Sequence, residues 1–227
     1  MQNHLGQPIG EPLDWQGAKK PQHTMLAGRY CGLEPFSPRH SKALFEAFSA
    51  DTDGRCWTYL PNGPYAAFDD FAAYIASISQ SDDPLFFAIC DGTGTPLGYA
   101  SLLRISPEAG SIEVGWINLS PALQGTRAST EAQFLLMRYV FQLGYRRYEW
   151  KCDALNAPSR RTAARLGFTF EGVFRQATVY KSRNRDTAWF SVIDSEWPAL
   201  CAGFEAWLSP DNFSDDGRQK AKLHSGE

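Results

Sequence analysis

The sequence of 227 residues predicts an α/β fold: a mixed, largely antiparallel sheet of six or seven strands with helices on both faces. Three observations lead to this prediction. Strand patterns and helix patterns alternate along the chain, a glycine-containing turn joins two neighbouring strand patterns, and the last two strand patterns follow each other directly. With 43% hydrophobic residues the chain can bury one sizeable core, so a single main domain is expected.

The N-terminal part combines an arm, a strand and two helices. Residues 1–24 are rich in glycine, proline and polar side chains, which predicts an extended arm, and the folded domain is expected over 25–198. A strand is predicted at 26–35. Hydrophobic residues then recur at helical spacing in two segments, on either side of a turn-rich aromatic loop, at 40–49 and 68–78.

Three strands and a long helix are predicted in the middle of the chain, at 85–90, 96–105, 111–119 and 126–143. The sequence Asp-Gly-Thr-Gly at 91–94 is typical of a hairpin between the first two strands. Pro121 cannot extend a hydrogen-bonded ladder, so the third strand ends before it. Hydrophobic residues cover one face of the helix, and Gly144 follows its end.

The C-terminal part closes the sheet. Residues 147–153 alternate strictly, with Tyr148, Trp150 and Cys152 on one face and charged residues on the other. The next predicted elements are a short helix at 158–166, strands at 169–181 and 188–195, and a helix at 200–208. Residues 199–227 are expected to form a C-terminal helix followed by a flexible tail, because the segment from 209 onward is polar.

Composition narrows the classes of function. A net charge of -3 and a pI near 5.8 disfavour nucleic-acid binding. Residues 145–185, however, contain ten Lys and Arg residues and three acidic ones. The local net charge of +7 favours binding of a multiply charged anion. Five scattered cysteines without a CxxC pair indicate reduced thiols in a cytoplasm and no metal site. No hydrophobic run is long enough to span a membrane, and no secretory signal is present.

The segment from Ile112 to Gly172 is the most informative one. It contains a strand ending near a proline, a small-residue loop opening a long helix, an alternating strand, an Asn-x-x-Ser turn and a short helix closed by Gly-Phe. This order resembles the acyl-CoA site of the GNAT superfamily of N-acetyltransferases, in the branch of the ribosomal-protein N-terminal (Rim-type) acetyltransferases. The resemblance extends over about 28–197. It implies acetyl-CoA or another acyl-CoA as co-substrate, no metal, and a sheet that splits at the cofactor site.

The resemblance also assigns cofactor-binding residues. It assigns the pyrophosphate to the loop and the helix start, at Gln124, Gly125, Thr126, Arg127, Ala128 and Ser129. It assigns the pantetheine arm to the strand edge and the second helix start, at Ile117, Asn118, Leu119, Asn156, Ser159 and Arg160. The superfamily signature is Gln/Arg-x-x-Gly-x-Gly/Ala. Only Gly125 fits it fully, because its first position falls on Ala122 and its last on Arg127. The alternative is an ordinary helix start with Thr130 and Gln133 as a capping box.

Acetyl transfer to an amine needs a base for the amine and an acid for the leaving thiolate, and the family implies direct transfer in a ternary complex. Many relatives use a tyrosine as the acid, and Ala163 occupies the equivalent position here. Ser159 is therefore the candidate acid, or else a hydroxyl that bonds the backbone of the first helical turn. Glu113 is the candidate base, acting through a water. The alternatives for Glu113 are an exposed carboxylate paired with an arginine across the strands, with solvent as the base.

The acceptor side is expected in the aromatic loop between the first two helices, where the candidate substrate-binding residues are Trp57, Tyr59, Leu60 and Tyr65. These side chains either cover a substrate or cap the core. The final hairpin, with its basic tip at 183–186, is the expected second wall. The acceptor is predicted to be a small-molecule amine or a protein N-terminus, and the chain a monomer or homodimer. A succinyl-type donor and a non-catalytic acyl-CoA-binding module are the alternatives.

Overall fold

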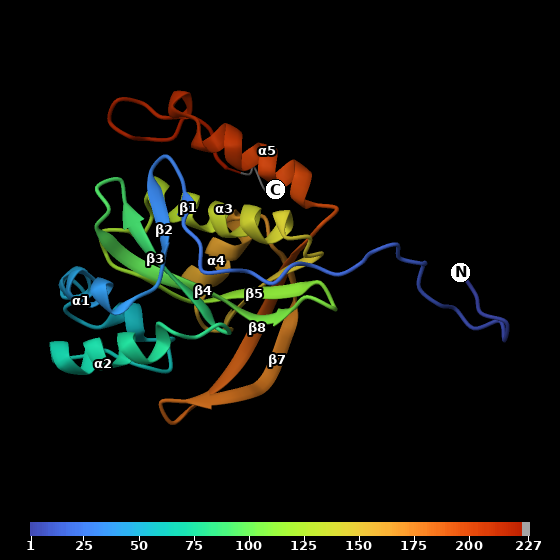
Figure 1. Ribbon diagram of the computed structural model, residues 1–227, viewed down its shortest axis with the longest axis horizontal. Coiled ribbons are helices and arrows are strands. Elements are labelled where there is room, and N and C mark those ends of the chain that lie inside the picture. Colours follow the sequence, from blue (N-terminus) through green and yellow to red (C-terminus); the bar gives the residue numbers. More distant parts are fainter. Residues whose placement is uncertain (224–227) are drawn as a thin grey trace.

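The computed structural model describes residues 1–223, which are organised around one eight-stranded sheet (Figure 1). The strands are β1 (Leu26–Ala27), β2 (Cys31–Pro35), β3 (Leu85–Asp91), β4 (Pro96–Ser106), β5 (Ser111–Leu119), β6 (Arg147–Asp153), β7 (Thr169–Tyr180) and β8 (Arg183–Ile193). The helices are α1 (Ser41–Phe48), α2 (Phe68–Ile78), α3 (Arg127–Gln142), α4 (Ala157–Arg165) and α5 (Trp197–Leu208). The predicted fold class is confirmed. The strand count rises to eight because the predicted first strand divides at a turn into β1 and β2.

Strand order in the sheet is β1-β2-β3-β4-β5-β6-β8-β7. Neighbouring strands pair antiparallel except β5 and β6, which run parallel because α3 crosses over between them. The parallel pair lies in the middle of the sheet. Parallel pairing is slightly less stable per residue than antiparallel pairing.

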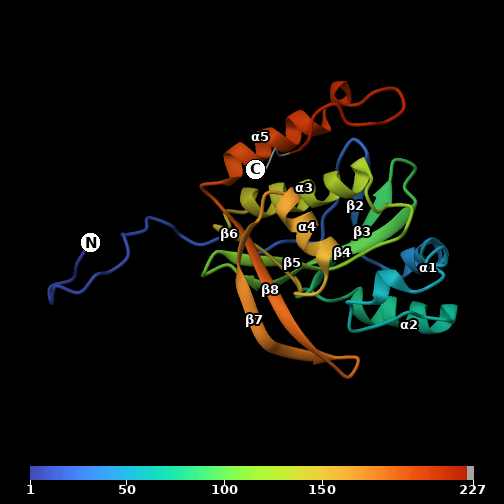
Figure 2. The ribbon, with the colours of Figure 1, turned by 180° about the vertical axis from the view of Figure 1, so that it is seen from behind.

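Two hydrophobic cores lie on opposite faces of the sheet, and β3 supplies both. Leu85, Phe87 and Ile89 join the core beneath α3, α4 and α5, whereas Phe86 and Ala88 join the core beneath α1 and α2. Successive side chains of a strand point to opposite faces, so a strand buried on both sides reads as a continuous hydrophobic run. Figure 2 shows α4 next to α3, beside β6.

A buried carboxylate ties α3 to the turn between β1 and β2. Glu131 is 4% exposed and accepts backbone N–H bonds from Arg29 at 2.8 Å, Tyr30 at 2.6 Å and Cys31 at 2.8 Å. A Cβ at Gly28 would lie 2.5 Å from this carboxylate, so the turn requires glycine there. The turn that divides the first strand is thus held in place by a side chain distant in sequence.

Replacing Glu131 with glutamine should lower the free energy of unfolding by about 3 kcal/mol. The amide offers only one acceptor oxygen and directs N–H groups toward three backbone donors, and bonds to a charged acceptor contribute about 1.5–3 kcal/mol each. Urea unfolding of the purified variant measures this loss. The control is Glu205→Gln on the exposed side of α5, for which a change within about 0.5 kcal/mol is expected. Equal losses in the two variants would contradict the role of Glu131.

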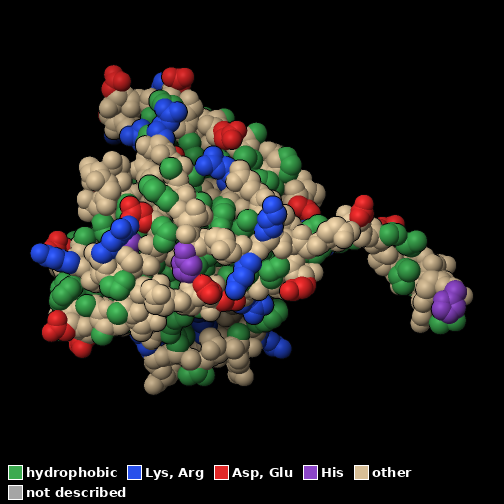
Figure 3. Space-filling model, in the orientation of Figure 1, with side chains coloured by type: hydrophobic (Ala, Val, Ile, Leu, Met, Phe, Trp, Pro, Cys, Tyr) green, Lys and Arg blue, Asp and Glu red, His purple; other side chains and the backbone are tan. Residues whose placement is uncertain are grey.

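The N-terminal arm projects from the domain, whereas the C-terminal segment packs against it. Residues 1–14 project away from the body, with exposed hydrophobic side chains such as Leu5 and Leu13 (Figure 3). The arm joins the body at Trp15, whose Nε1 donates to the Gly144 carbonyl at 3.2 Å. At the other end, residues 209–223 fold back onto α5 and bury Phe213 and Leu223, although their polarity predicts a frayed or disordered segment. The rest of that predicted tail, 224–227, lies outside the described residues.

Candidate active site

The sheet splits between β5 and β6. Parallel pairing covers only Ser111–Val114 against Arg147–Trp150, although both strands continue beyond these residues. On their outer edges pairing goes on: Leu119 faces Gly98 of β4, and Asp153 faces Thr187 of β8. Each strand therefore follows its other neighbour, and the inner backbone edge of β5 at 115–119 has no strand partner on this side. This is the split that the family resemblance implies.

A β-bulge accompanies the divergence of β5. Tyr99 pairs with Asn118 and Ser101 with Gly115, so a single residue of β4 faces both Trp116 and Ile117. Trp116 has φ of 50°, in the left-handed region. A bulge adds twist and redirects the strand, which bends the end of β5 away from β6.

One cavity of about 1200 Å³ runs through this split. Its lining includes the edge residues Ile117, Asn118 and Leu119 together with side chains from both faces of the sheet. On the sheet face covered by α3, α4 and α5, the cavity reaches the starts of α3 and α4. On the face covered by α1 and α2, it reaches Glu113 and Lys151. A long, narrow ligand can therefore enter along one face and present its end at the other.

The start of α3 forms one end of the cavity. Gly125 has φ of 71° and open space where a Cβ would stand, and Thr126 caps the helix by accepting the N–H of Ser129 at 3.1 Å. The first N–H groups of a helix have no intrahelical acceptor, so those of Arg127 and Ala128 stay available to an anion. The predicted capping box of Thr130 and Gln133 is not formed, because the cap lies four residues earlier.

Two further side chains of this loop have defined positions. The Gln124 side chain donates to the Leu119 carbonyl at 2.8 Å and so closes the end of β5. The Arg127 guanidinium lies 4.9 Å from the Tyr30 ring centre and 4.6 Å from that of Phe213, and it lines the cavity. Within residues 1–223 no carboxylate forms an ion pair with Arg127. Its charge is therefore directed to the cavity region.

The start of α4 forms a second polar wall. Asn156 caps the helix, accepting the N–H of Ser159 at 3.1 Å. The Ser159 hydroxyl oxygen accepts a hydrogen bond from Trp150 Nε1 at 3.0 Å and lines the cavity. Burial raises the pKa of the Cys152 thiol, and a hydrogen bond from the same Ser159 hydroxyl opposes that rise.

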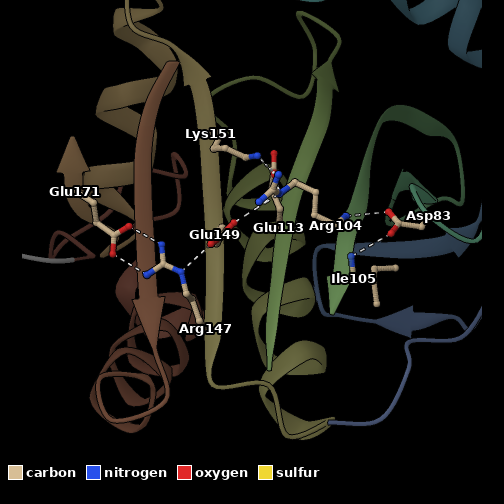
Figure 4. Close-up of polar contacts among 8 residues, drawn as sticks. All are labelled: Asp83, Arg104, Ile105, Glu113, Arg147, Glu149, Lys151 and Glu171. Carbon is tan, nitrogen blue, oxygen red and sulfur yellow. Dashed lines mark hydrogen bonds and ion pairs between the residues drawn. The ribbon is translucent and has the colours of Figure 1, made fainter. Parts of the chain in front are cut away.

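Glu113 belongs to a network of charged residues on the face of the sheet away from α3 (Figure 4). Its side chain is buried, with Oε2 at 2.5 Å from Lys151 Nζ and 3.4 Å from Arg104 Nε. Burial raises the pKa of the Glu113 carboxyl, and the Lys151 ammonium opposes that rise. The expected pairing with a cross-strand arginine is present, but the carboxylate is buried at the cavity wall and not exposed.

The network also includes Arg147, Glu149 and Glu171, which do not line the cavity. Arg147 bonds both Glu149 and Glu171, linking β6 to β7. Lys151 also lies 4.2 Å from the Trp189 ring centre. Glu113 and Glu149 are thus two buried carboxylates of one network, and only Glu113 borders the cavity.

The aromatic loop forms a further wall of the cavity and reaches the loop before α3, since Gln124 Nε2 donates to Cys56 Sγ at 3.1 Å. Tyr59 and Leu60 line the cavity, and the Tyr59 hydroxyl donates to the Leu155 carbonyl at 3.2 Å. The β7–β8 hairpin reaches the same loop, since Lys181 Nζ donates to the Trp57 carbonyl at 2.8 Å and Arg183 to that of Thr58 at 2.8 Å. The loop and the hairpin are thus in direct contact beside the cavity.

Four predicted site residues have side chains that do not line the cavity. Trp57 is 3% exposed and, with Tyr65, packs in the aromatic core beneath α1 and α2, so both cap the core and do not line the cavity. Ala128 packs against the core beneath α3, which leaves only its backbone near the loop. Arg160 points away from the cavity, over the Phe170 ring, because it lies on the outer side of α4.

Arg185, in the predicted basic tip, lines the cavity, and so do several residues for which the sequence predicts no site role: Thr130, Gln133, Lys151, Arg165, Trp207 and Phe213. Helical spacing from Thr126 would have found Thr130 and Gln133, which lie on the same side of α3. Trp207 and Phe213 had no local signal, since they reach the cavity only through the packing of α5 on α3. The described residues contain no cluster of His, Cys, Asp and Glu suited to a metal ion. Nor does any helix within residues 1–223 have the length and hydrophobicity needed to cross a bilayer.

Comparison with known proteins gives the same result as the geometry. The acetyltransferase (GNAT) domain family matches residues 31–169. A GCN5-related N-acetyltransferase from Brucella melitensis is 49% identical, with a TM-score of 0.90 over 92% of this chain and 96% of that chain. A probable GNAT-family acetyltransferase from Chromobacterium violaceum is 41% identical, with a TM-score of 0.78 over 85% of this chain and 99% of that one.

A more distant neighbour belongs to the Rim-type branch. It is Mycobacterium smegmatis RimJ in complex with CoA-disulfide, 19% identical, with a TM-score of 0.66 over 78% of this chain and 88% of that chain, a likeness of fold. No curated protein matches. The split sheet, the glycine turn before α3 and the family match over more than half of the chain agree, and the chain belongs to the GNAT family of N-acetyltransferases.

Proposed function

We propose that this protein transfers the acetyl group of acetyl-CoA directly to a primary amine within a ternary complex. The observation that carries the proposal is the cavity that passes through the split sheet. One end has the unpaired N–H groups at the start of α3, suited to a pyrophosphate, and Glu113 lines the cavity on the other face of the sheet. The free edge of β5 at 117–119 suits the amide-rich pantetheine arm.

The transfer forms one bond and breaks one. The amine nitrogen bonds to the carbonyl carbon of the thioester, the carbon–sulfur bond breaks, the sulfur gains a proton and the amine loses one. Glu113 is the proposed base, receiving the amine proton through a water. Ser159 is the proposed acid for the sulfur, because its hydroxyl lines the cavity and Trp150 Nε1 holds its oxygen in place.

The raised pKa of Glu113 supports its proposed role. A carboxyl whose pKa is raised by burial is a stronger base than an exposed one, and the Lys151 ammonium at 2.5 Å stabilises its carboxylate form. Asp153 also lines the cavity, but its oxygens already accept from the Tyr180 hydroxyl at 2.8 Å and the Leu155 N–H at 2.8 Å. Glu113 is therefore the better candidate.

A specific observation favours a second candidate, transfer of an acidic acyl group such as succinyl. Arg185 lines the cavity, and its buried Nε has no hydrogen-bond partner within the described residues. Such a group suits a carboxylate on the donor or on the acceptor.

Isothermal titration with acetyl-CoA, succinyl-CoA and free CoA tests both candidates. We expect micromolar binding of acetyl-CoA, followed by thiol release when amines are added, with free-N-terminal peptides and small polyamines as the two acceptor sets. Preference for succinyl-CoA by about tenfold, lost in Arg185→Gln, would establish the second candidate instead. Binding without turnover of any donor would contradict both and indicate a binding module.

A further inference from the structure

The C-terminal segment forms a wall of the cavity, although it lies outside the part of the chain that matches the family. Helix α5 packs on α3, with the Phe134 and Phe204 rings stacked at 5.2 Å. The chain then turns back, and the turn is held by a bond from Trp207 Nε1 to Gln219 Oε1 at 2.8 Å. This C-terminal wall comprises Trp207, Phe213, Gly217 and Gln219.

Two arginines of the cavity pack against the aromatic rings of this wall. Arg127 lies over Phe213, and Arg165 lies 5.0 Å from the Trp207 ring centre while donating to Thr130 Oγ1 at 3.1 Å. Within residues 1–223 neither forms an ion pair with a carboxylate. Guanidinium groups stacked on rings keep their edge N–H groups free, and these suit phosphate oxygens.

A buried amide beside them also has no partner. Gln133 is 4% exposed, lines the cavity, and forms no hydrogen bond through either its Nε2 or its Oε1. Buried polar groups are nearly always paired, so an unpaired donor and acceptor at a cavity wall indicate a ligand with polar edges. A purine or a ribose has such edges, whereas the pantetheine arm is bound along β5.

We infer that the C-terminal wall, together with Arg165 and Gln133, holds the 3′-phosphoadenosine end of CoA. This inference rests on the proposed function. The wall adjoins the start of α3, the proposed pyrophosphate site. It lies on the sheet face covered by α3, α4 and α5, and Glu113 lies on the opposite face. The Trp207 and Phe213 rings hold the guanidinium groups of Arg165 and Arg127 at the cavity wall, and Arg165 is the group for the 3′-phosphate. The nucleotide thus gains contacts from a segment beyond the family match.

Calorimetric titration with CoA, 3′-dephospho-CoA and 4′-phosphopantetheine tests the inference without any turnover assay. Trp207→Leu should weaken CoA binding about tenfold and change phosphopantetheine binding by less than about twofold. Arg165→Gln should weaken CoA binding about tenfold and leave 3′-dephospho-CoA binding unchanged. Phe213→Leu, which keeps most of the packed volume, gives a second test if Trp207→Leu does not fold.

Matched controls separate stability from binding. Trp197→Leu removes a tryptophan that packs α5 against Phe141 far from the cavity, and Arg161→Gln removes an exposed charge of α4 that does not line it. Both should bind CoA as the wild type does. Equal weakening of CoA and phosphopantetheine by Trp207→Leu and Phe213→Leu would overturn the inference, as would equal affinities of the wild type for the two ligands. Failure of the wild type to bind any of the three would overturn the proposed function itself.

Discussion

Replacing Gly125 with valine should weaken acetyl-CoA binding by about 100-fold. Gly125 has φ of 71°, which costs a residue with a Cβ about 1–2 kcal/mol, and the space that the new side chain enters is the open end of the cavity. The side chain would keep phosphate oxygens from the N–H groups at the start of α3. Losing one or two bonds to a charged group, at about 1.5–3 kcal/mol each, corresponds to such a change in affinity.

Titration of acetyl-CoA measures the effect, and Gly94→Val is the matched control. Gly94 has φ of 83°, equally open space and no contact with the cavity, because it lies in the β3–β4 turn. Both variants should lose similar stability in urea unfolding, but only Gly125→Val should lose affinity. If the two bind acetyl-CoA equally well, the start of α3 is not the pyrophosphate site.

Replacing Glu113 with glutamine should lower kcat by about 100-fold and leave the KM for acetyl-CoA nearly unchanged. General base catalysis contributes about 10²–10⁴-fold, and an amide cannot accept the amine proton. Only the carboxylate form is active, so the wild-type rate should fall as the pH drops through the pKa of Glu113. Burial raises this pKa, so the fall should begin at a higher pH than for an exposed glutamate. This acidic limb should be absent in the variant.

Steady-state kinetics across pH measure this prediction, with Glu149→Gln as the control. Glu149 is a buried carboxylate of the same network, bonded to Arg147 at 2.7 Å, but it does not line the cavity. Its replacement should lower stability and change kcat by less than about threefold. Ser159→Ala should also lower kcat, by about tenfold, through loss of the proposed acid. An equal fall in kcat in the two glutamine variants would assign Glu113 a structural role only.

Local patterns in the sequence were sufficient for the elements that form the site. Alternation in 147–153 predicts β6, and Gly125 with the small residues after it predicts a helix start able to approach an anion. Tyr59 and Leu60 in the aromatic loop line the cavity. Trp57 and Tyr65 from the same loop do not, because a turn-rich aromatic segment has no periodicity that separates a core-facing side chain from a cavity-facing one.

Long-range packing could not be predicted in the same way. The Glu131 carboxylate bonds a turn about 100 residues away, and nothing near Glu131 in the sequence indicates that turn. The 209–223 segment reads as polar and frayed, yet Phe213 and Leu223 are buried because α5 and α3 offer them a hydrophobic surface.

The sequence by itself determined the α/β class, the order of the elements and the family resemblance, because these depend on periodicity and on short motifs. Only the tertiary structure decided where β5 leaves β6, that Glu113 is buried beside Lys151, and that Trp207 and Phe213 reach the cavity. The physical reason is that burial, charge pairing and cavity walls arise between residues distant in sequence. Their positions are set by how α3, α5 and the strands pack together, and no local pattern records that packing.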